Sequence, residues 1–152
     1  MLRMECVLLI GIPASGKSSF YAHRFAATHL RLNLDMLRTR HREAELLATC
    51  LRLQQPFVVD NTNVAVAERA RFLVPARAAG FRTVGFYLAS KLDVCLPRNA
   101  GRIGDARVPD VALRDMARRL ELPEMGEGFD ALHYVRMADG GFVVEDWRDE
   151  VR

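Results

Sequence analysis

The chain has 152 residues and a mass of 17.2 kDa, the size of one ordinary domain, so we predict a single domain over residues 1–152. Half of the residues are hydrophobic and 27% are charged, which excludes a disordered chain, collagen and a coiled coil. The net charge is +3, with 19 basic and 10 acidic residues over 1–120 and 3 basic and 9 acidic residues over 121–152. A basic body attracts polyanions, although a solvated surface of mixed charge gives the same arithmetic.

The sequence shows no sign of a membrane span, an export signal or a disulfide framework. The longest apolar runs have the length of a strand, and the N-terminus lacks the pattern of a signal peptide. We therefore expect a cytoplasmic protein with no membrane partner, and no motif implies an obligate protein partner. The three cysteines, Cys6, Cys50 and Cys95, lie far apart and are expected to be buried small side chains.

The first part of the chain predicts a strand, a turn and two helices. Val7–Ile10 is a continuous apolar run, typical of a buried parallel strand, and a glycine-rich turn leads from it into a helix expected to reach about His29. A short apolar segment over 30–34 follows. A second helix, with apolar residues along one face, ends before Pro56.

The same alternation continues to the end of the chain. Phe57–Val59 and Phe81–Leu88 are predicted as core strands, with a helix between them that ends at Gly80. Residues 97–109 lack apolar periodicity and are predicted as a mobile loop between two helices. A strand, a turn and a strand complete the chain over 131–147. This order predicts an α/β fold with a mostly parallel sheet, helices on both faces and a ligand at the carboxyl ends of the strands.

Residues 11–18 carry the strongest chemical signal. Gly-Ile-Pro-Ala-Ser-Gly-Lys-Ser matches the phosphate-loop pattern G-x-x-x-x-G-K-[ST] in full, between a predicted strand and a predicted helix. Its glycines let backbone N–H groups turn toward phosphates, its lysine reaches the β and γ phosphates, and its serine binds Mg²⁺. We therefore predict a nucleoside triphosphate site. Its expected binding residues are Gly11, Pro13, Ala14, Ser15, Gly16, Lys17, Ser18 and Ser19.

Two carboxylates are candidates for phosphoryl transfer. A helical turn after Asn33 would place Asp35 and Arg38 on one face, where the first takes the acceptor proton and the second holds an acceptor phosphate. By position alone, Asp35 as a helix N-cap and Arg38 as a surface charge are an equally good interpretation. Asp60 follows a predicted strand, a place from which a carboxylate organises Mg²⁺ or its waters.

A lid is predicted over about residues 98–108. Arg98 and Arg102 are one helical turn apart at the mouth of the glycine-containing loop, where they could close on the phosphates of a nucleotide. With 20 arginines among the 22 basic residues, a solvated surface position is the usual role of any one of them. Asn61, Thr62 and Asn63 precede a helix, and capping would explain at least one of them.

Together these motifs resemble the kinase module of 5′-polynucleotide kinases. The similar segments, in the same order over about residues 5–137, are Gly-x-Pro-x-x-Gly-Lys-Ser, Asn-x-Asp-x-x-Arg, Val-Val-Asp-Asn-Thr-Asn, Arg-Asn-x-x-Arg and Val-Pro-Asp. The resemblance implies a P-loop NTPase fold of the adenylate-kinase type, ATP and Mg²⁺ as cofactors, and DNA or RNA ends as partners. The implied reaction transfers the γ-phosphate of ATP to a 5′-hydroxyl.

The resemblance also implies roles for single residues. Lys17 and Ser18 would bind phosphate and metal, and Asp60 and Asn63 would line the same site, with Asp60 also near the metal. On the acceptor side, Asp35 would be the general base and Arg38 would bind the acceptor phosphate. From the lid, Arg102 beside Arg98 would stabilise the transferring phosphoryl group.

Two other functions remain open. Relatives with similar loops phosphorylate sugars, nucleotides or antibiotics, so a small-molecule kinase is the main alternative. A nucleotide-binding regulatory module, with residues 121–152 as its interaction surface, is the other. Asp35, Arg38 and Arg102 argue against it, because a switch needs no acceptor-side base. No Asp-x-Asp occurs in the chain, so we expect no aspartyl phosphatase activity beside the kinase.

Overall fold

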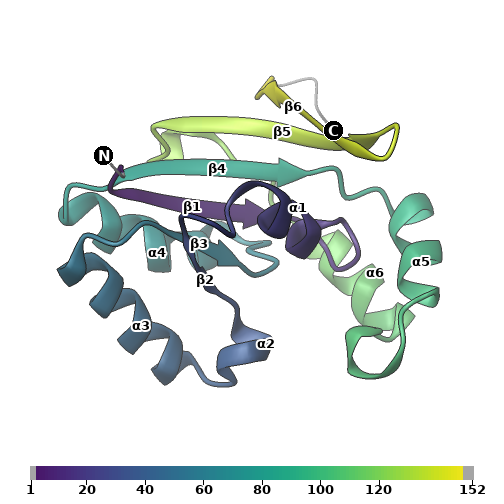
Figure 1. Cartoon of the computed structure of the whole chain (residues 1–152). Coiled ribbons are helices and arrows are strands. Elements are labelled where there is room, and N and C mark those ends of the chain that lie inside the picture. The colour runs from purple at the N-terminus through teal and green to yellow at the C-terminus, as the bar shows by residue number, and fades with distance from the viewer. Residues whose placement is uncertain (1–2, 149–152) are drawn as a thin grey trace.

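A six-stranded sheet forms the centre of the computed structural model, which describes residues 3–148 (Figure 1). The strand order is β2-β3-β1-β4-β5-β6; β6 runs antiparallel to β5 and all other neighbours are parallel. The strands are β1 (Glu5–Ile10), β2 (Leu30–Leu32), β3 (Phe57–Asp60), β4 (Arg82–Leu88), β5 (Ala131–Ala138) and β6 (Gly141–Asp146). The mostly parallel sheet confirms the predicted fold class.

Helices cover both faces of the sheet and its carboxyl end. α3 and α4 pack on one face and α1 on the other, while α5 and α6 lie beyond the ends of the strands, toward which the arrowheads of β1 and β4 point in Figure 1. The helices are α1 (Lys17–Arg24), α2 (Leu34–Leu37), α3 (Arg40–Leu53), α4 (Val66–Ala78), α5 (Leu92–Ala100) and α6 (Asp110–Arg119), with 3-10 turns η1 (Gly104–Ala106) and η2 (Met125–Glu127).

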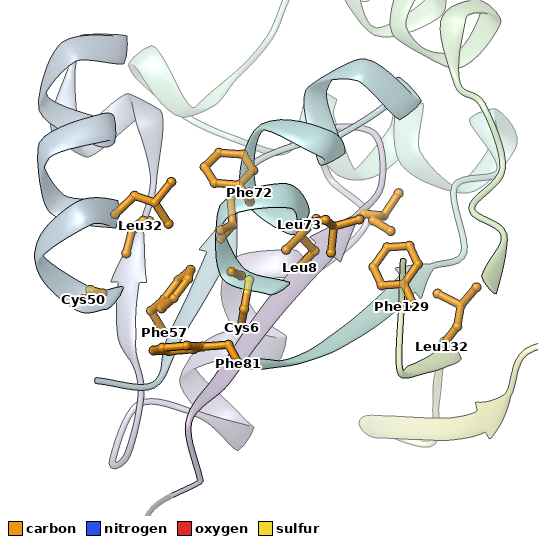
Figure 2. Packing of buried hydrophobic residues seen from close by; sticks show 14 of the residues in the cluster. Cys6, Leu8, Leu32, Cys50, Phe57, Phe72, Leu73, Phe81, Phe129 and Leu132 are labelled. Atoms are coloured by element: carbon orange, nitrogen blue, oxygen red, sulfur yellow. The ribbon is translucent and has the colours of Figure 1, made fainter. Parts of the chain in front are cut away.

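The alternation of side chains along β1 divides the core into two layers. Cys6, Leu8 and Ile10 face α3 and α4, whereas Val7 and Leu9 face α1. Figure 2 shows part of the first layer, with side chains from β1, β3 and α4 packed together. All three cysteines are buried and free, as predicted. Because both faces of β1 are buried, the position at which the strand ends is fixed by the core.

Two predicted element boundaries before β3 differ from the structure. The helix after the phosphate loop ends at Arg24, not near His29, because the chain turns at Phe25, whose ring packs on Phe20 and Phe86 in the core. The segment predicted over 30–34 is a strand only to Leu32. Its successor, Asn33, caps α2 by accepting a hydrogen bond from the N–H of Met36 (3.0 Å), so a helical turn starts there.

The loop predicted from residue 97 begins later than expected. α5 continues through Pro97 to Ala100, because its apolar side packs beneath the phosphate loop. That cluster consists of Ile12, Ala14, Cys95 and Leu113, with Leu92, Leu96, Met116 and Ala117 against it. The loop therefore spans 101–109, and its far end is the N-cap of α6 at Pro109.

A buried ion pair joins α4 to the chain before β5. Arg69 is fully buried, and its Nε and Nη2 donate to the two carboxylate oxygens of Glu127 (2.7 and 3.0 Å). Its Nη1 donates to the carbonyl of Asn63 (2.8 Å), in the loop after β3. This arginine therefore holds three separate segments in one arrangement.

Removing the guanidinium should destabilise the fold strongly. We expect Arg69→Ala to lower the free energy of unfolding by about 3–5 kcal/mol, because it leaves a carboxylate buried without its cation. Urea unfolding followed by circular dichroism measures the change. The paired replacement of Arg69 by Met and Glu127 by Leu removes both charges and should recover much of the loss. An equal loss in the single and double variants would contradict this account.

Candidate active site

The phosphate loop joins β1 to α1 in a conformation that needs its glycines. Gly16 has a φ of 101°, in the left-handed region that favours glycine, and a Cβ there would lie 2.5 Å from Met137 Cε. A Cβ on Gly11 would lie 2.6 Å from Ser15 Oγ. Substitution at either glycine would therefore force the loop or its neighbours to move.

The loops after β3 and β4 hold the phosphate loop from both sides. The N–H of Gly11 donates to the carbonyl of Thr62 (3.0 Å), and the N–H of Ile12 donates to Ser90 Oγ (3.1 Å). Since β3 and β4 are the two neighbours of β1, these contacts follow directly from the strand order. The loop is thus fixed at the carboxyl end of the sheet, where the sequence predicts the ligand.

Lys17 folds back over the loop. Its Nζ donates to the carbonyls of Gly11 (2.9 Å) and Ile12 (3.0 Å). Burial lowers the pKa of Lys17 to about 8; the charge of Asp60 opposes this shift and that of Arg102 adds to it. The charge of Asp35 also raises this pKa, so three predicted site residues act electrostatically on the lysine.

Asp60 ends β3 beside the first turn of α1. Ser18 Oγ donates to Asp60 Oδ2 (3.1 Å), and Arg31 Nε donates to the same oxygen (2.8 Å). The sequence analysis missed Arg31. The sequence feature that could have indicated it is an arginine between two leucines in a short strand. The alternation along a strand places the side chain of Arg31 on the opposite side from Leu32.

An amide network holds the turn that carries Asp35. Asn33 Nδ2 donates to the carbonyl of Asp60 (2.6 Å), and Asn61 Oδ1 accepts from the N–H of Leu34 (2.9 Å). Asn61 Nδ2 in turn donates to the buried carboxylate of Glu43 (3.0 Å). The N-cap of α2 is therefore Asn33, and the interpretation of Asp35 as that cap is wrong.

Asp35 and Arg38 are exposed at the two ends of this turn. Arg38 has a φ of 78° and follows the last residue of α2, where its N–H donates to the carbonyl of Leu34 (2.7 Å). Asp35 lies in the first turn of α2. The amide network thus fixes the backbone of both residues and leaves their side chains open to solvent.

The lid arginines lie on either side of the end of α5. Arg98 Nη1 donates to the carbonyl of Ala14 (3.5 Å) in the phosphate loop, whereas Arg102 Nη1 donates to the carbonyl of Ala106 (3.2 Å) within the lid. Buried Asn99 closes the base of the lid, because its amide donates to and accepts from the backbone of Val108 (2.5 and 2.9 Å). Residues 101–107 are all exposed.

Two predicted site residues turn away from the phosphate loop. Asn63 is buried, and its Nδ2 donates to the carbonyl of Leu9 in β1 (2.8 Å), so it ties the loop after β3 to the central strand. Ser19 is exposed on α1 and faces the turn between β5 and β6, where it lines a hollow with residues 137–142. Asn63 therefore holds the backbone around the site, and Ser19 faces the hairpin.

Ser18 and Asp60 present oxygen donors that suit Mg²⁺. A hydroxyl and a carboxylate are hard ligands, and a magnesium ion in such a site completes its shell with phosphate oxygens and waters. Within residues 3–148, no group of three or more His, Cys, Asp or Glu side chains could hold a metal ion. The donors present fit an ion that arrives with a nucleotide.

Comparison with protein families matches residues 6–123 to a family described as AAA domain. The chain belongs to this family. It is also similar to the bifunctional polynucleotide phosphatase/kinase of Schizosaccharomyces pombe, with 26% identity over 129 residues. The match covers 82% of this chain and 32% of that protein, so the chain spans about a third of the length of the relative.

Solved structures share the fold at low sequence identity. Kti12 of Chaetomium thermophilum, in complex with ADP-AlF3, has a TM-score of 0.65 and 15% identity, and the match covers 86% of this chain and 88% of that one. A gluconokinase from Sinorhizobium meliloti has a TM-score of 0.61 and 19% identity, with 91% and 86% covered. The chain therefore has a P-loop NTPase fold. None of the helices in residues 3–148 has the length and hydropathy needed to cross a membrane.

Nucleotide binding should be linked to protonation of Lys17. With a pKa of about 8, this lysine is roughly half charged at pH 8 in the free protein, and bound phosphates favour the charged form. We therefore expect ATP to bind with uptake of roughly half a proton at pH 8, and its affinity to fall as the pH rises further. Calorimetry in buffers of different ionisation enthalpy measures the uptake. Lys17→Arg is the control, since its guanidinium does not titrate; equal uptake in both proteins would refute the assignment.

Proposed function

We propose that the chain is an ATP-dependent kinase that phosphorylates the 5′-hydroxyl ends of DNA or RNA. The observation that carries this proposal is that Asp35 lies on an exposed turn whose cap, Asn33, is bonded to the carbonyl of Asp60 at the site. Membership of the family supports nucleotide binding, and the similarity to the polynucleotide phosphatase/kinase supports the acceptor.

In the proposed reaction, Asp35 takes the proton of the acceptor hydroxyl. The hydroxyl oxygen attacks the γ-phosphorus of ATP, and the bond from that phosphorus to the bridging oxygen breaks, so that ADP leaves. Lys17 neutralises charge on the β and γ phosphates, and Arg102 stabilises the transferring group when the lid closes. A magnesium ion held by Ser18 and Asp60 would neutralise further charge on the phosphates.

A cavity beside the phosphate loop suits the base of the nucleotide. Its volume is about 280 Å³, and its walls combine apolar side chains with basic ones. Ser15 Oγ, at its edge, is buried and lacks a hydrogen-bond partner among the described residues, so it is available to a ligand. Its basic side chains are Lys91, Arg98 and Arg136, and its apolar side includes Leu88, Val94, Met137 and Phe142. The apolar side chains offer a surface for a flat heterocycle, and the basic ones suit its attached phosphates.

The acceptor side favours a polymer over a metabolite. Small-molecule sites bury most of their ligand, whereas the side chains of Asp35 and Arg38 are exposed. The exposed arginines Arg40 and Arg42 follow closely, and Arg40 also pairs with Glu43, so positive charge lies near the acceptor carboxylate. Such charge matches the phosphates that continue along a strand beyond its 5′ end.

Loss of the base should abolish transfer while ATP still binds. We expect Asp35→Asn to lower kcat with a 5′-hydroxyl oligonucleotide by about 10²–10⁴-fold, because a positioned general base contributes that much. Transfer from γ-labelled ATP to DNA and RNA oligonucleotides measures it, with 5′-phosphorylated strands as blank. Glu45→Gln, an exposed carboxylate of α3, is the matched control.

Unchanged transfer in Asp35→Asn would refute the assigned base. If the wild-type protein labels no oligonucleotide but a small hydroxyl compound stimulates ATP turnover, the acceptor is a metabolite and the polynucleotide proposal is wrong.

Salt should weaken binding of the acceptor more than binding of the nucleotide, because a strand has more phosphates to contact. Phosphate contacts release counterions, so KM for a single strand should rise steeply with salt, and loss of one contact should reduce the slope of log KM against log salt by about 0.7. We expect this reduction for Arg38→Gln. Arg52→Gln, at the far end of α3, should keep the wild-type slope. A flat salt profile in the wild-type protein would argue against a polyanionic acceptor.

A further inference from the structure

Arg31 of β2 places a guanidinium on both oxygen donors of the proposed metal site. Its Nε donates to Asp60 Oδ2 (2.8 Å) and its Nη2 donates to Ser18 Oγ (3.0 Å), while Ser18 Oγ donates to Oδ2 (3.1 Å). The three groups form a closed ring of hydrogen bonds. We propose that Arg31 is an internal cation that occupies this site and that nucleotide-bound Mg²⁺ has to displace it. The inference rests on the metal site of the proposed function.

The free protein needs a cation at this position. The side chain of Asp60 is only 1% exposed, and a buried carboxylate is costly unless it is paired. Lys17 donates to the carbonyls of Gly11 and Ile12 and makes no hydrogen bond to Asp60 among the described residues. Arg31 makes the ion pair with Asp60 and thereby stabilises the site without nucleotide.

Arg31 and a divalent ion exclude each other. Asp60 Oδ2 accepts two hydrogen bonds and Ser18 Oγ accepts one, so lone pairs that a metal ion would use are directed at donors. Mg²⁺ also requires ligands at close range in a nearly octahedral shell. Two cations on the same pair of oxygens would repel each other strongly because the site is largely closed to water.

The side chain of Arg31 is able to leave. It is 30% exposed, and it belongs to the edge strand of the sheet, so a change of its side-chain angles suffices. Its guanidinium carbon lies 5.9 Å from the centre of the Tyr21 ring, which offers a cation a favourable surface outside the hydrogen-bonded ring. The exchange therefore needs no change of the backbone.

The competition is measured by the Mg²⁺ dependence of nucleotide binding. A fluorescent, non-hydrolysable ATP analogue is titrated at increasing Mg²⁺ concentrations and in EDTA. We expect Arg31→Gln to lower the half-saturating Mg²⁺ concentration about fivefold or more, because the ion no longer has a competitor. Affinity in EDTA should change less than about twofold. Arg31→Lys keeps a cation, so its half-saturating Mg²⁺ concentration should lie between those of the wild type and Arg31→Gln. Arg52→Gln should behave as the wild type.

Two results would overturn the proposal. One is a half-saturating Mg²⁺ concentration that is unchanged or higher in Arg31→Gln. The other is a loss of affinity in EDTA without a gain with Mg²⁺, which would make Arg31 a phosphate ligand instead. These titrations need only nucleotide binding, so they stand or fall independently of whether an oligonucleotide is phosphorylated.

Thermal unfolding gives a second measurement without nucleotide. Arg31→Gln should lower Tm, because Asp60 remains buried and unpaired. Adding Asp60→Asn should restore most of the loss, since the amide needs no cation. If the double variant is no more stable than Arg31→Gln alone, the ion pair does not hold the free site and the proposal is wrong.

Discussion

The site depends on the parallel register of the three central strands. β1 pairs with β3 and β4 so that Leu9 lies level with Asp60, and Ile10 lies level with Tyr87. The phosphate loop therefore leaves the sheet just beyond the level at which Asp60 ends its own strand. A slip of one residue would turn the carboxylate to the opposite face of the sheet and away from Ser18. The apolar core prevents that slip, because every residue of β3 is buried.

Apolar packing positions the strands, but the loops at their ends need polar contacts. Such loops carry backbone N–H and carbonyl groups that must be paired when they are buried. In this chain, buried polar side chains pair them: Asn63 donates to Leu9, Arg69 donates to Asn63, and Asn99 bonds both polar groups of Val108. Fully paired networks of this kind specify a single arrangement. The loop after β3 and the base of the predicted lid are therefore fixed, whereas residues 101–107 are exposed.

The parts of this molecule that the sequence predicts are those encoded in neighbouring residues. The phosphate loop and the apolar strands are local patterns, and the order of the elements then implies that Asp60 lies beside Ser18. The features that the sequence did not predict depend on contacts between distant segments. Asn33 is held at the start of α2 because its amide donates to the carbonyl of Asp60, at the end of another strand, and Arg31 reaches the site through the pairing of β2 with β3. No periodicity within either segment encodes those contacts.

The charges around the loop explain how such a site would tell a metal–nucleotide complex from bare phosphate. Without a ligand, Lys17 is bound to loop carbonyls, and Asp60 is bound to Arg31, so neither charge is left unpaired. A bare phosphate supplies an anion for the lysine but no cation for the carboxylate, and thus replaces only one of these two interactions. The complex of a nucleotide with a divalent ion supplies both, because its phosphates pair with the lysine and its metal pairs with the carboxylate. In the proposed competition, Arg31 would make the metal a condition of full binding, and its release would leave a free positive charge four residues before Asp35.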